Sequence, residues 1–588
     1  MKNMVRLFLD YCVVPFQPAS TSVIVRRIRF VSLTTVAIFM LWLLGFGTVH
    51  LWVRYFNERP QSRWYREPAN QNSGIVIIVH GWTKGPEDML EVAEIVKSNP
   101  NYDQDGIYLW AYEADRFSNK DPVALAHNLA SRIAELHREA SGDIVLIGHS
   151  LGGLVIRRAF LIDLDDTKQW SPSVRRIVLL AAPNRGTEAT SRSPWLWVGD
   201  GLAKSFRVGE LIRSVYRGAP FIVDLRIDWI KRFQKLKNPP LVAQIVGSKD
   251  NLVSSSDSID VLQFPNSIDR HLANSTHESI VRKDEAGVYI REALVAQRDD
   301  RGTQMADRNS VLKLLLVHGI RDYGERFDQI RDAVKALAIQ RNISLQASSP
   351  RYKYFSALQF INPLSRWHKI YEFADLYTEM LATPPVDAPI YFVGHSFGTY
   401  LMGKSTEYYK SMEFDRVYLA GSVLREDFFA KHNLLGNRIK WVRNDIAAKD
   451  WPVGILCSGL DGLGLAEDVG TGGFNGFSGI VREDRYEEFR LFDGGHGEAL
   501  TLTNRPTIAA WLLQGRISSF DHTQVKEMLV RAKVLVQSRA YLWELTSRAA
   551  PGLFVAFIAL ITYLLLIGKR PFVALGEILF VMWFLNII

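Results

Sequence analysis

The chain has 588 residues and a formal net charge of +8, and 47% of its residues are hydrophobic. Because a domain takes roughly 150 residues, this length predicts two or three domains with sizeable cores. The sequence carries no zinc-ligand spacing, RNA-binding aromatic motif or long basic run, which argues against a nucleic-acid partner. The chain has two cysteines, Cys12 and Cys457, and they predict no disulfide framework.

The N-terminus predicts a membrane anchor. Residues 1–29 form a basic tail, and residues 30–53 contain no Asp, Glu, Lys or Arg. A helix of that length crosses a hydrocarbon core of about 30 Å. A cleaved signal peptide is the alternative, but the tail is too long for one and no small-residue cleavage pattern follows. We therefore predict a retained transmembrane helix at 30–53.

Strands and helices alternate through the segment 70–295. Its first apolar run, GIVIIVHGW, ends in His-Gly and is typical of a strand covered on both faces in a parallel sheet. Asp121 and Pro122 then predict a helix start, since Asp caps a helix well and Pro fits its first turn. A second apolar run, DIVLIGH, leads into Ser150 and the helical stretch LGGLVIRRAFLID.

An insertion at about 191–237 is rich in tryptophan and leucine. We predict that it forms an apolar cap over a pocket for an acyl chain. The alternative is that its helices complete the hydrophobic core.

The second half of the chain repeats the first. A polar stretch without periodicity at 297–310 predicts a linker. The segment 311–515 then contains KLLLVHGI, the run PIYFVGH leading into Ser396, and the helical stretch FGTYLMGKSTEYYKS. A repeat of this length indicates a duplicated domain, because solenoid repeats span about 20–50 residues. The predicted fold class is α/β, with two doubly wound, mostly parallel sheets flanked by transmembrane helices.

The C-terminus predicts further contact with a membrane. Residues 516–548 place apolar residues at helical spacing among basic ones, which favours an amphipathic helix on a membrane surface or a connecting helix. Residues 549–568 are uncharged and predict a transmembrane helix, whereas 571–588 predict a spanning or an interfacial helix. The positive-inside rule places the segment between the anchors on the non-cytoplasmic side.

Each repeat contains Gly-His-Ser-x-Gly between a strand and a helix, with Ser150 in the first and Ser396 in the second. This context is the one that a nucleophile elbow requires, because a sharp strand-to-helix turn exposes the serine hydroxyl. Glycines two positions on either side let the backbone pass close by. A serine needs a histidine to accept its proton and a carboxylate to orient that histidine.

On this scaffold the chain order is serine, then acid, then histidine. In the first repeat this order selects Asp250, after an apolar strand, and His277. In the second it selects Asp450 and His496. The two acid segments match each other, SKDNLV against AKDWPV. We therefore predict two Ser-His-Asp triads.

Alternatives to these residues exist in both repeats. Asp461, in CSGLDGLG, is the alternative acid of the second repeat. In the first repeat, His271 and Asp257 are weaker competitors for the base and the acid.

The oxyanion of a tetrahedral intermediate needs backbone N–H donors. One donor should follow each serine, and the other should follow each His-Gly strand end. The four predicted donors are Trp82, Leu151, Ile320 and Phe397. The strand-end histidines, His80 and His318, are predicted to shape the oxyanion loops and not to transfer protons.

These motifs resemble the α/β-hydrolase superfamily in both repeats. The first repeat, with VHGW, GHSLGG and LLAAPNRGT, is similar to the lipase and glycosylphosphatidylinositol-inositol-deacylase-like branch. The second, with VHGI, GHSFGT, YLAGSV and GGH, resembles the superfamily but no single branch, and it lacks the Pro-Asn-Arg-Gly segment. The resemblance implies acyl-transfer chemistry with neither a cofactor nor a metal.

The predicted function is a membrane-anchored serine hydrolase that cleaves lipid or other acyl esters. One alternative is that one or both domains are non-catalytic modules that bind a partner. Another is an amidase or a thioesterase that uses the same residues. The expected partners are the acyl-ester substrate and the membrane bilayer.

Overall fold

The computed structural model describes residues 60–515, except for 117, 167–168, 188–208, 251–259, 261–263, 265–266, 298–310, 321–323, 351–354, 357–358, 361, 448, 463–467 and 492–493. The predicted N-terminal tail and membrane helix, most of the linker, and the whole C-terminal region from 516 onward lie outside the described residues. Among the helices that are described, none has the length and hydropathy needed to cross a membrane.

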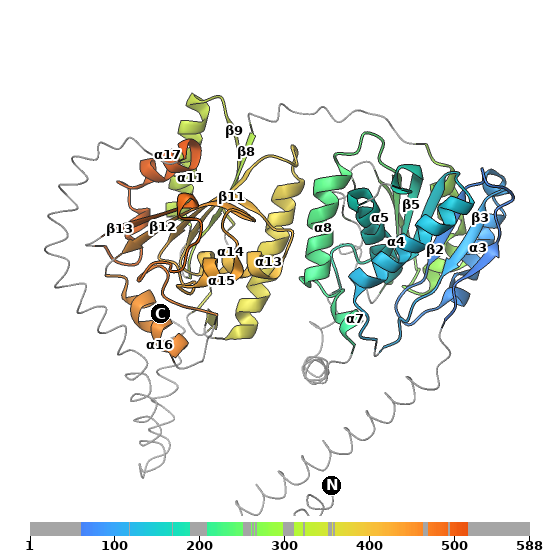
Figure 1. Cartoon of the computed structure of the whole chain (residues 1–588), viewed down its shortest axis with the longest axis horizontal. Helices are drawn as coiled ribbons and strands as arrows, with labels where there is room; N and C mark the ends of the chain where they lie inside the picture. Colours follow the sequence, from blue (N-terminus) through green and yellow to red (C-terminus); the bar gives the residue numbers. More distant parts are fainter. Residues whose placement is uncertain are drawn as a thin grey trace, which may run out of the picture. The chain divides into compact units, whose positions relative to one another are not determined.

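The first half of the described chain forms a seven-stranded sheet (Figure 1). Its strand order is β1-β3-β2-β4-β5-β6-β7. The edge strand β1 is antiparallel to β3, and all other neighbours are parallel. The strands are β1 (Arg63–Arg66), β2 (Ile75–Val79), β3 (Gly106–Trp110), β4 (Ile144–His149), β5 (Val174–Leu180), β6 (Leu241–Gly247) and β7 (Ile268–Leu272).

The second half forms a six-stranded sheet in the order β13-β12-β11-β10-β8-β9. All of its neighbouring strands are parallel. The strands are β8 (Val311–Val317), β9 (Ser344–Ser348), β10 (Ile390–His395), β11 (Phe414–Ala420), β12 (Ile439–Ala447) and β13 (Tyr486–Leu491).

The two sheets have the same topology once β1 is set aside. In chain order, the strands of each sheet occupy the positions 2-1-3-4-5-6 across it. In each, the strand that ends in His-Gly pairs with the strand that leads into the serine, β2 with β4 and β8 with β10. The predicted α/β fold with mostly parallel sheets is therefore confirmed.

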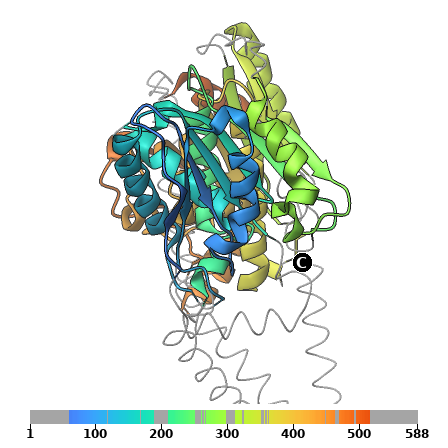
Figure 2. The ribbon, with the colours of Figure 1, turned by 90° about the vertical axis from the view of Figure 1, so that its right-hand side faces the viewer.

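Helices cover both faces of each sheet, as Figure 2 shows for the first sheet. On the first sheet, α4, α5 and α8 pack on one face, and α3 and α10 pack on the other. On the second, α13 and α14 pack on one face, and α11 and α17 pack on the other. Their bounds are α3 (Leu90–Lys97), α4 (Pro122–Glu139), α5 (Leu151–Asp166), α8 (Pro220–Phe233), α10 (Lys283–Val295), α11 (Glu325–Gln340), α13 (Pro363–Ala382), α14 (Phe397–Tyr408) and α17 (Arg505–Gln514). Three short helices complete the described part: α7 (Glu210–Arg213), α15 (Phe428–His432) and α16 (Ser458–Gly462).

The central strand β2 shows why its sequence is uniformly apolar. Ile75 and Ile77 pack into the core with α4 and α5, whereas Val76 and Ile78 pack into the core on the opposite face. Successive side chains of a strand point to opposite faces, so a strand covered on both faces must be apolar at every position.

The described part of the predicted cap belongs to the core. In α8, the side chains of Ile222, Leu225 and Trp229 are buried in the same core as α4 and α5. The Trp229 and Phe233 rings stack with their centroids 4.6 Å apart. Residues 188–208, which include the N-terminal part of the insertion, lie outside the described residues.

A buried lysine in β8 gives the first testable prediction. The Lys313 side chain has no solvent exposure, and its ammonium group donates a hydrogen bond to the Leu381 carbonyl oxygen at 2.9 Å. Burial lowers the pKa of Lys313 to about 8, whereas an unfolded lysine titrates near 10.4. The unfolded state therefore binds more protons between these pH values, and the free energy of unfolding rises with pH across that window.

We expect Lys313→Met to be more stable than the wild type at pH 7 by up to about 3 kcal/mol, since each pKa unit is worth about 1.4 kcal/mol. The difference should shrink as pH rises from 8 to above 10. Urea unfolding followed by tryptophan fluorescence at pH 7, 9 and 10.5 measures it. Lys335→Met, which removes an exposed charge from α11, is the control. A variant that is less stable at every pH would contradict the expectation.

Candidate active site

Both serines sit at the tip of a strand-to-helix turn. Ser150 joins β4 to α5 and Ser396 joins β10 to α14, and each has a φ of +52°. That backbone conformation is uncommon for a non-glycine residue and costs about 1–3 kcal/mol. The next strand stabilises each turn, because the Ser150 N–H donates to the Leu180 carbonyl at 2.8 Å and the Ser396 N–H donates to the Ala420 carbonyl at 3.0 Å.

The glycine two residues after each serine is required by close backbone contact. A Cβ atom on Gly152 would lie 2.5 Å from the Val79 carbonyl oxygen. A Cβ atom on Gly398 would lie 2.2 Å from the Val317 carbonyl oxygen. Since real Cβ atoms do not approach oxygen so closely, both turns can lie against the neighbouring strand only with glycine at these positions.

The first site contains a continuous chain of hydrogen bonds. His277 Nε2 lies 2.9 Å from Ser150 Oγ, and His277 Nδ1 lies 2.7 Å from Asp250 Oδ2. Asp250 follows β6 and His277 follows β7, so three loops at one edge of the sheet supply the three groups. The Asp250 side chain is 2% exposed. The imidazole is thus placed to accept a proton from the hydroxyl while the buried carboxylate holds its other nitrogen.

The second site contains the same acid and base. His496 Nδ1 lies 2.8 Å from Asp450 Oδ2, and Asp450 Oδ1 accepts a hydrogen bond from the Val453 N–H at 3.1 Å. Asp450 is fully buried. Within the described residues, Ser396 and His496 form no hydrogen bond with each other, which distinguishes this site from the first. Catalytic hydrogen bonds often tighten only when substrate binds.

The alternative acid and base residues lie elsewhere. Asp461 forms an ion pair with Arg425, and burial raises the pKa of the Asp461 carboxyl. His271 is on β7 and exposed, and Asp257 lies outside the described residues. The structure therefore brings His496 together with Asp450 and not with Asp461.

The loops after β2 and β8 pass directly beside the serines. A Cβ atom on Gly81 would lie 2.9 Å from Ser150 Cβ, and one on Gly319 would lie 2.7 Å from Ser396 Cβ. The predicted oxyanion donors are the residues after these glycines and after the serines. Their backbone N–H groups find no acceptor among the described residues: Trp82, Leu151, Ile320 and Phe397. Unpaired N–H groups next to a nucleophile can bind a developing oxyanion.

The strand-end histidines contact these loops. His80 Nδ1 donates to the Gly81 carbonyl at 2.9 Å, and its Nε2 accepts from the Tyr112 N–H at 3.3 Å. His318 Nδ1 makes the matching contact with the Gly319 carbonyl at 2.8 Å. Burial lowers the pKa of His80 to about 4, so its ring is neutral at pH 7 and holds the loop through backbone groups.

Two further histidines are absent from the sequence-based prediction of the site. His149 Nε2 donates to the carbonyl oxygen of His277 at 2.9 Å, and His395 Nε2 donates to that of His496 at the same distance. Burial lowers the pKa of each to about 3, so both rings are neutral at pH 7. The sequence signal that could have identified them is the histidine that stands immediately before each serine. In the structure, this histidine links the elbow to the loop that carries the base.

We expect His149→Leu to lower kcat at the first site by roughly tenfold, because the buried His277 carbonyl would lose its donor, a change that costs about 1–3 kcal/mol. Hydrolysis of a chromogenic ester by the full chain carrying Ser396→Ala measures this effect. His271→Gln, which changes an exposed side chain of β7, is the control and should behave as its parent. Unchanged kcat in His149→Leu would mean that the contact does not position the base.

One protein family matches part of the first half of the chain. Residues 69–196 match the family described as "Putative serine esterase (DUF676)". That region includes Ser150 and both predicted oxyanion donors of the first site, but it ends before Asp250. A search of curated proteins gives no match.

Solved structures similar to part of this chain include lipases and a phospholipase. The Bacillus licheniformis lipase BlEst2 in its propeptide form is 14% identical, with 42% of this chain and 56% of that chain covered and a TM-score of 0.33. The Legionella pneumophila phospholipase PlaB is 14% identical, with 38% of this chain and 60% of that chain covered and a TM-score of 0.31. The Paleococcus ferrophilus monoacylglycerol lipase is 14% identical, with 40% and 97% covered and a TM-score of 0.28.

Residues 69–196 are thus similar to a family of serine esterases, and the described chain has an α/β fold with mostly parallel sheets. Within the described residues, no group of histidine, cysteine, aspartate and glutamate side chains is arranged to hold a metal ion.

Proposed function

We propose that the chain is a membrane-anchored serine hydrolase with two tandem α/β-hydrolase domains, residues 70–295 and 311–515, which cleave acyl esters. The observation that carries the proposal is the unbroken hydrogen-bond chain from Ser150 through His277 to Asp250. The second domain repeats the strand order, the elbow and the His-Asp pair of the first.

The geometry supports a double-displacement mechanism in the first site. His277 Nε2 accepts the proton as Ser150 Oγ attacks the ester carbonyl, and Asp250 stabilises the resulting imidazolium. The N–H groups of Trp82 and Leu151 stabilise the oxyanion. When the tetrahedral intermediate collapses, His277 donates this proton to the leaving alcohol. Water then attacks the acyl-enzyme, with His277 again accepting and returning the proton.

The second site would follow the same steps with Ser396, His496 and Asp450. Its serine must first form a hydrogen bond with His496, through rotation of the hydroxyl group or movement of the histidine loop. Because the described residues show no Ser396–His496 hydrogen bond, a second candidate function is favoured for this domain alone. In that case it would be a non-catalytic binding module. An amidase or thioesterase activity at the first site would use the same residues.

A lipid substrate is favoured by the uncharged segments at 30–53 and 549–568, which would hold both domains near a bilayer. The basic residues that flank these segments would interact with anionic headgroups. By the positive-inside rule, we place both domains on the non-cytoplasmic side of the membrane.

Fluorophosphonate labelling of the full chain tests the proposal. Peptide mapping should find the probe on Ser150 and on Ser396, and each alanine variant should lose only its own label. Labelling of Ser150 alone would identify the second domain as a binding module, and labelling of neither would refute the mechanism. Matched ester, thioester and amide substrates then separate an esterase from a thioesterase or an amidase.

A further inference from the structure

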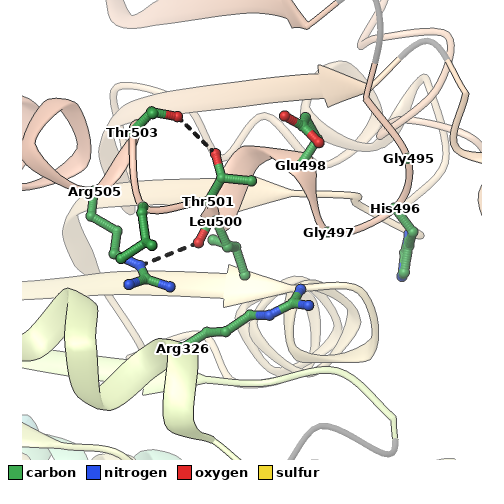
Figure 3. A pocket seen from close by; sticks show the side chains of 10 residues that line it. Arg326, Gly495, His496, Gly497, Glu498, Leu500, Thr501, Thr503 and Arg505 are labelled. Carbon is green, nitrogen blue, oxygen red and sulfur yellow. Dashed lines mark hydrogen bonds between the residues drawn. The ribbon is translucent and has the colours of Figure 1, made fainter.

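A pocket of about 520 Å³ lies beside the second candidate base, His496, which forms part of its wall. Volumes of a few hundred Å³ are typical of small-ligand sites. Two arginines from different helices also line it, Arg326 from α11 and Arg505 from α17. Figure 3 shows both side chains extending into the pocket, with the His496 ring at the other end.

Both arginines lie at helix N-termini, where the helix dipole disfavours a positive charge unless an anion is bound nearby. Arg505 is the first residue of α17 and Arg326 is the second residue of α11, so each lies at the positive end of a helix dipole. Arg505 is only 8% exposed, and its Nε donates to the Leu500 carbonyl at 3.3 Å. Burial and the charge of Arg326 both lower the pKa of Arg505, in agreement with two like charges that face the same space.

The described residues do not neutralise these charges. Neither guanidinium group forms an ion pair with any carboxylate of the described chain. Glu498 is the acidic residue among those that line the pocket, and it is exposed. In Figure 3 its carboxylate points away from both guanidinium groups.

In the first site, the positively charged side chain near the base is paired with carboxylates of the protein. The residue after His277 is Glu278, and its carboxylate lies 3.5 Å from the ammonium group of Lys84. Asp88 lies 3.6 Å from the same ammonium group. In the second site the residue after His496 is Gly497, where a Cβ atom would lie 2.3 Å from an Arg326 nitrogen. The cation beside the first base is thus paired within the protein, whereas those beside the second are available to a ligand.

We propose that Arg326 and Arg505 form a subsite for a phosphate group on the ester substrate of the second site, so that this site prefers anionic phosphate-bearing esters to neutral ones. The inference rests on the proposed function of that site. Guanidinium groups suit this role because they bind phosphate oxygens through paired N–H donors. Thr501 and Thr503, whose hydroxyl oxygens lie 3.2 Å apart in the pocket wall, offer further donors.

The test uses the full chain carrying Ser150→Ala, so that only the second site turns over. The substrates are dihexanoyl phosphatidic acid and dihexanoylglycerol, which share the same acyl esters and differ in the phosphate. The ratio of kcat/KM for the anionic ester to that for the neutral ester should favour the anionic one. Arg326→Gln, at an exposed position, should lower this ratio by about tenfold, mainly through KM, as expected for a lost charge-assisted hydrogen bond. Arg505→Gln should act in the same direction.

Arg341→Gln, at the other end of α11, is the matched control for loss of one positive charge and should leave the ratio unchanged. Equal turnover of both esters, or an unchanged ratio in Arg326→Gln, would overturn the subsite while leaving the hydrolase function intact. Inhibition by inorganic phosphate that disappears in Arg326→Gln, without any preference for the anionic ester, would indicate a free-phosphate site and overturn the substrate role. If neither ester is cleaved and fluorophosphonate does not label Ser396, the proposed function of the second site is wrong and the subsite with it.

Discussion

Replacement of both Ser150 and Ser396 by alanine is expected to lower ester hydrolysis by the full chain by about 10⁴-fold or more, the scale seen when triad serines are removed. An alanine cannot form the acyl-enzyme, so only water attack assisted by the oxyanion donors remains. Ser150→Ala alone should remove the larger share, because Ser150 Oγ already lies 2.9 Å from His277 Nε2. Initial rates on a chromogenic short-chain ester, at matched protein concentration, measure both effects.

A control separates lost chemistry from lost folding. Ser98→Ala changes an exposed serine at the end of α3 and should retain wild-type rates. The melting temperatures of the triad variants should match the wild type, since a serine-to-alanine change in an elbow removes one hydroxyl and no packing. A double variant that keeps even a tenth of the wild-type rate would place the chemistry at other residues.

The second large effect concerns the acid of the second site. In a Ser150→Ala background, Asp450→Asn is expected to lower kcat by about 10³- to 10⁴-fold, because an amide cannot hold His496 in the reactive tautomer or stabilise its positive charge. Asn keeps an oxygen that can accept from the Val453 N–H, so the loop should keep its conformation. Single-turnover measurements on an ester of the second site, together with fluorophosphonate labelling of Ser396, report the change.

Asp461→Asn is the matched comparison, because it removes the same charge from the ion pair with Arg425. It should alter kcat by less than about twofold, because Asp461 forms a partly exposed ion pair with Arg425, whereas His496 pairs with Asp450. The reverse pattern, with Asp461→Asn inactive and Asp450→Asn active, would show that the acid assignment is wrong.

The fold could be predicted from the sequence because its determinants are local. The apolar run of β2 and the Gly-His-Ser-x-Gly turns report burial on both faces and close backbone approach, which are properties of a few neighbouring residues. The chain order of serine, acid and histidine came from the resemblance to α/β-hydrolases. Loops at the carboxyl ends of parallel strands meet at one edge of the sheet, so residues in this order can come together. The match between the acid segments selected Asp450 over Asp461, and the structure pairs Asp450 with His496.

Contacts between loops distant in the sequence were decided by the tertiary structure. The hydrogen bonds from His149 and His395 to the carbonyls of the two bases span 128 and 101 residues. The absence of a Ser396–His496 hydrogen bond within the described chain, and the approach of Arg326 and Arg505 in one pocket, also depend on how whole helices and loops pack. A sequence pattern reports the conformation and burial of a segment, but the partner of a loop side chain depends on the relative positions of strands and helices far apart in the chain.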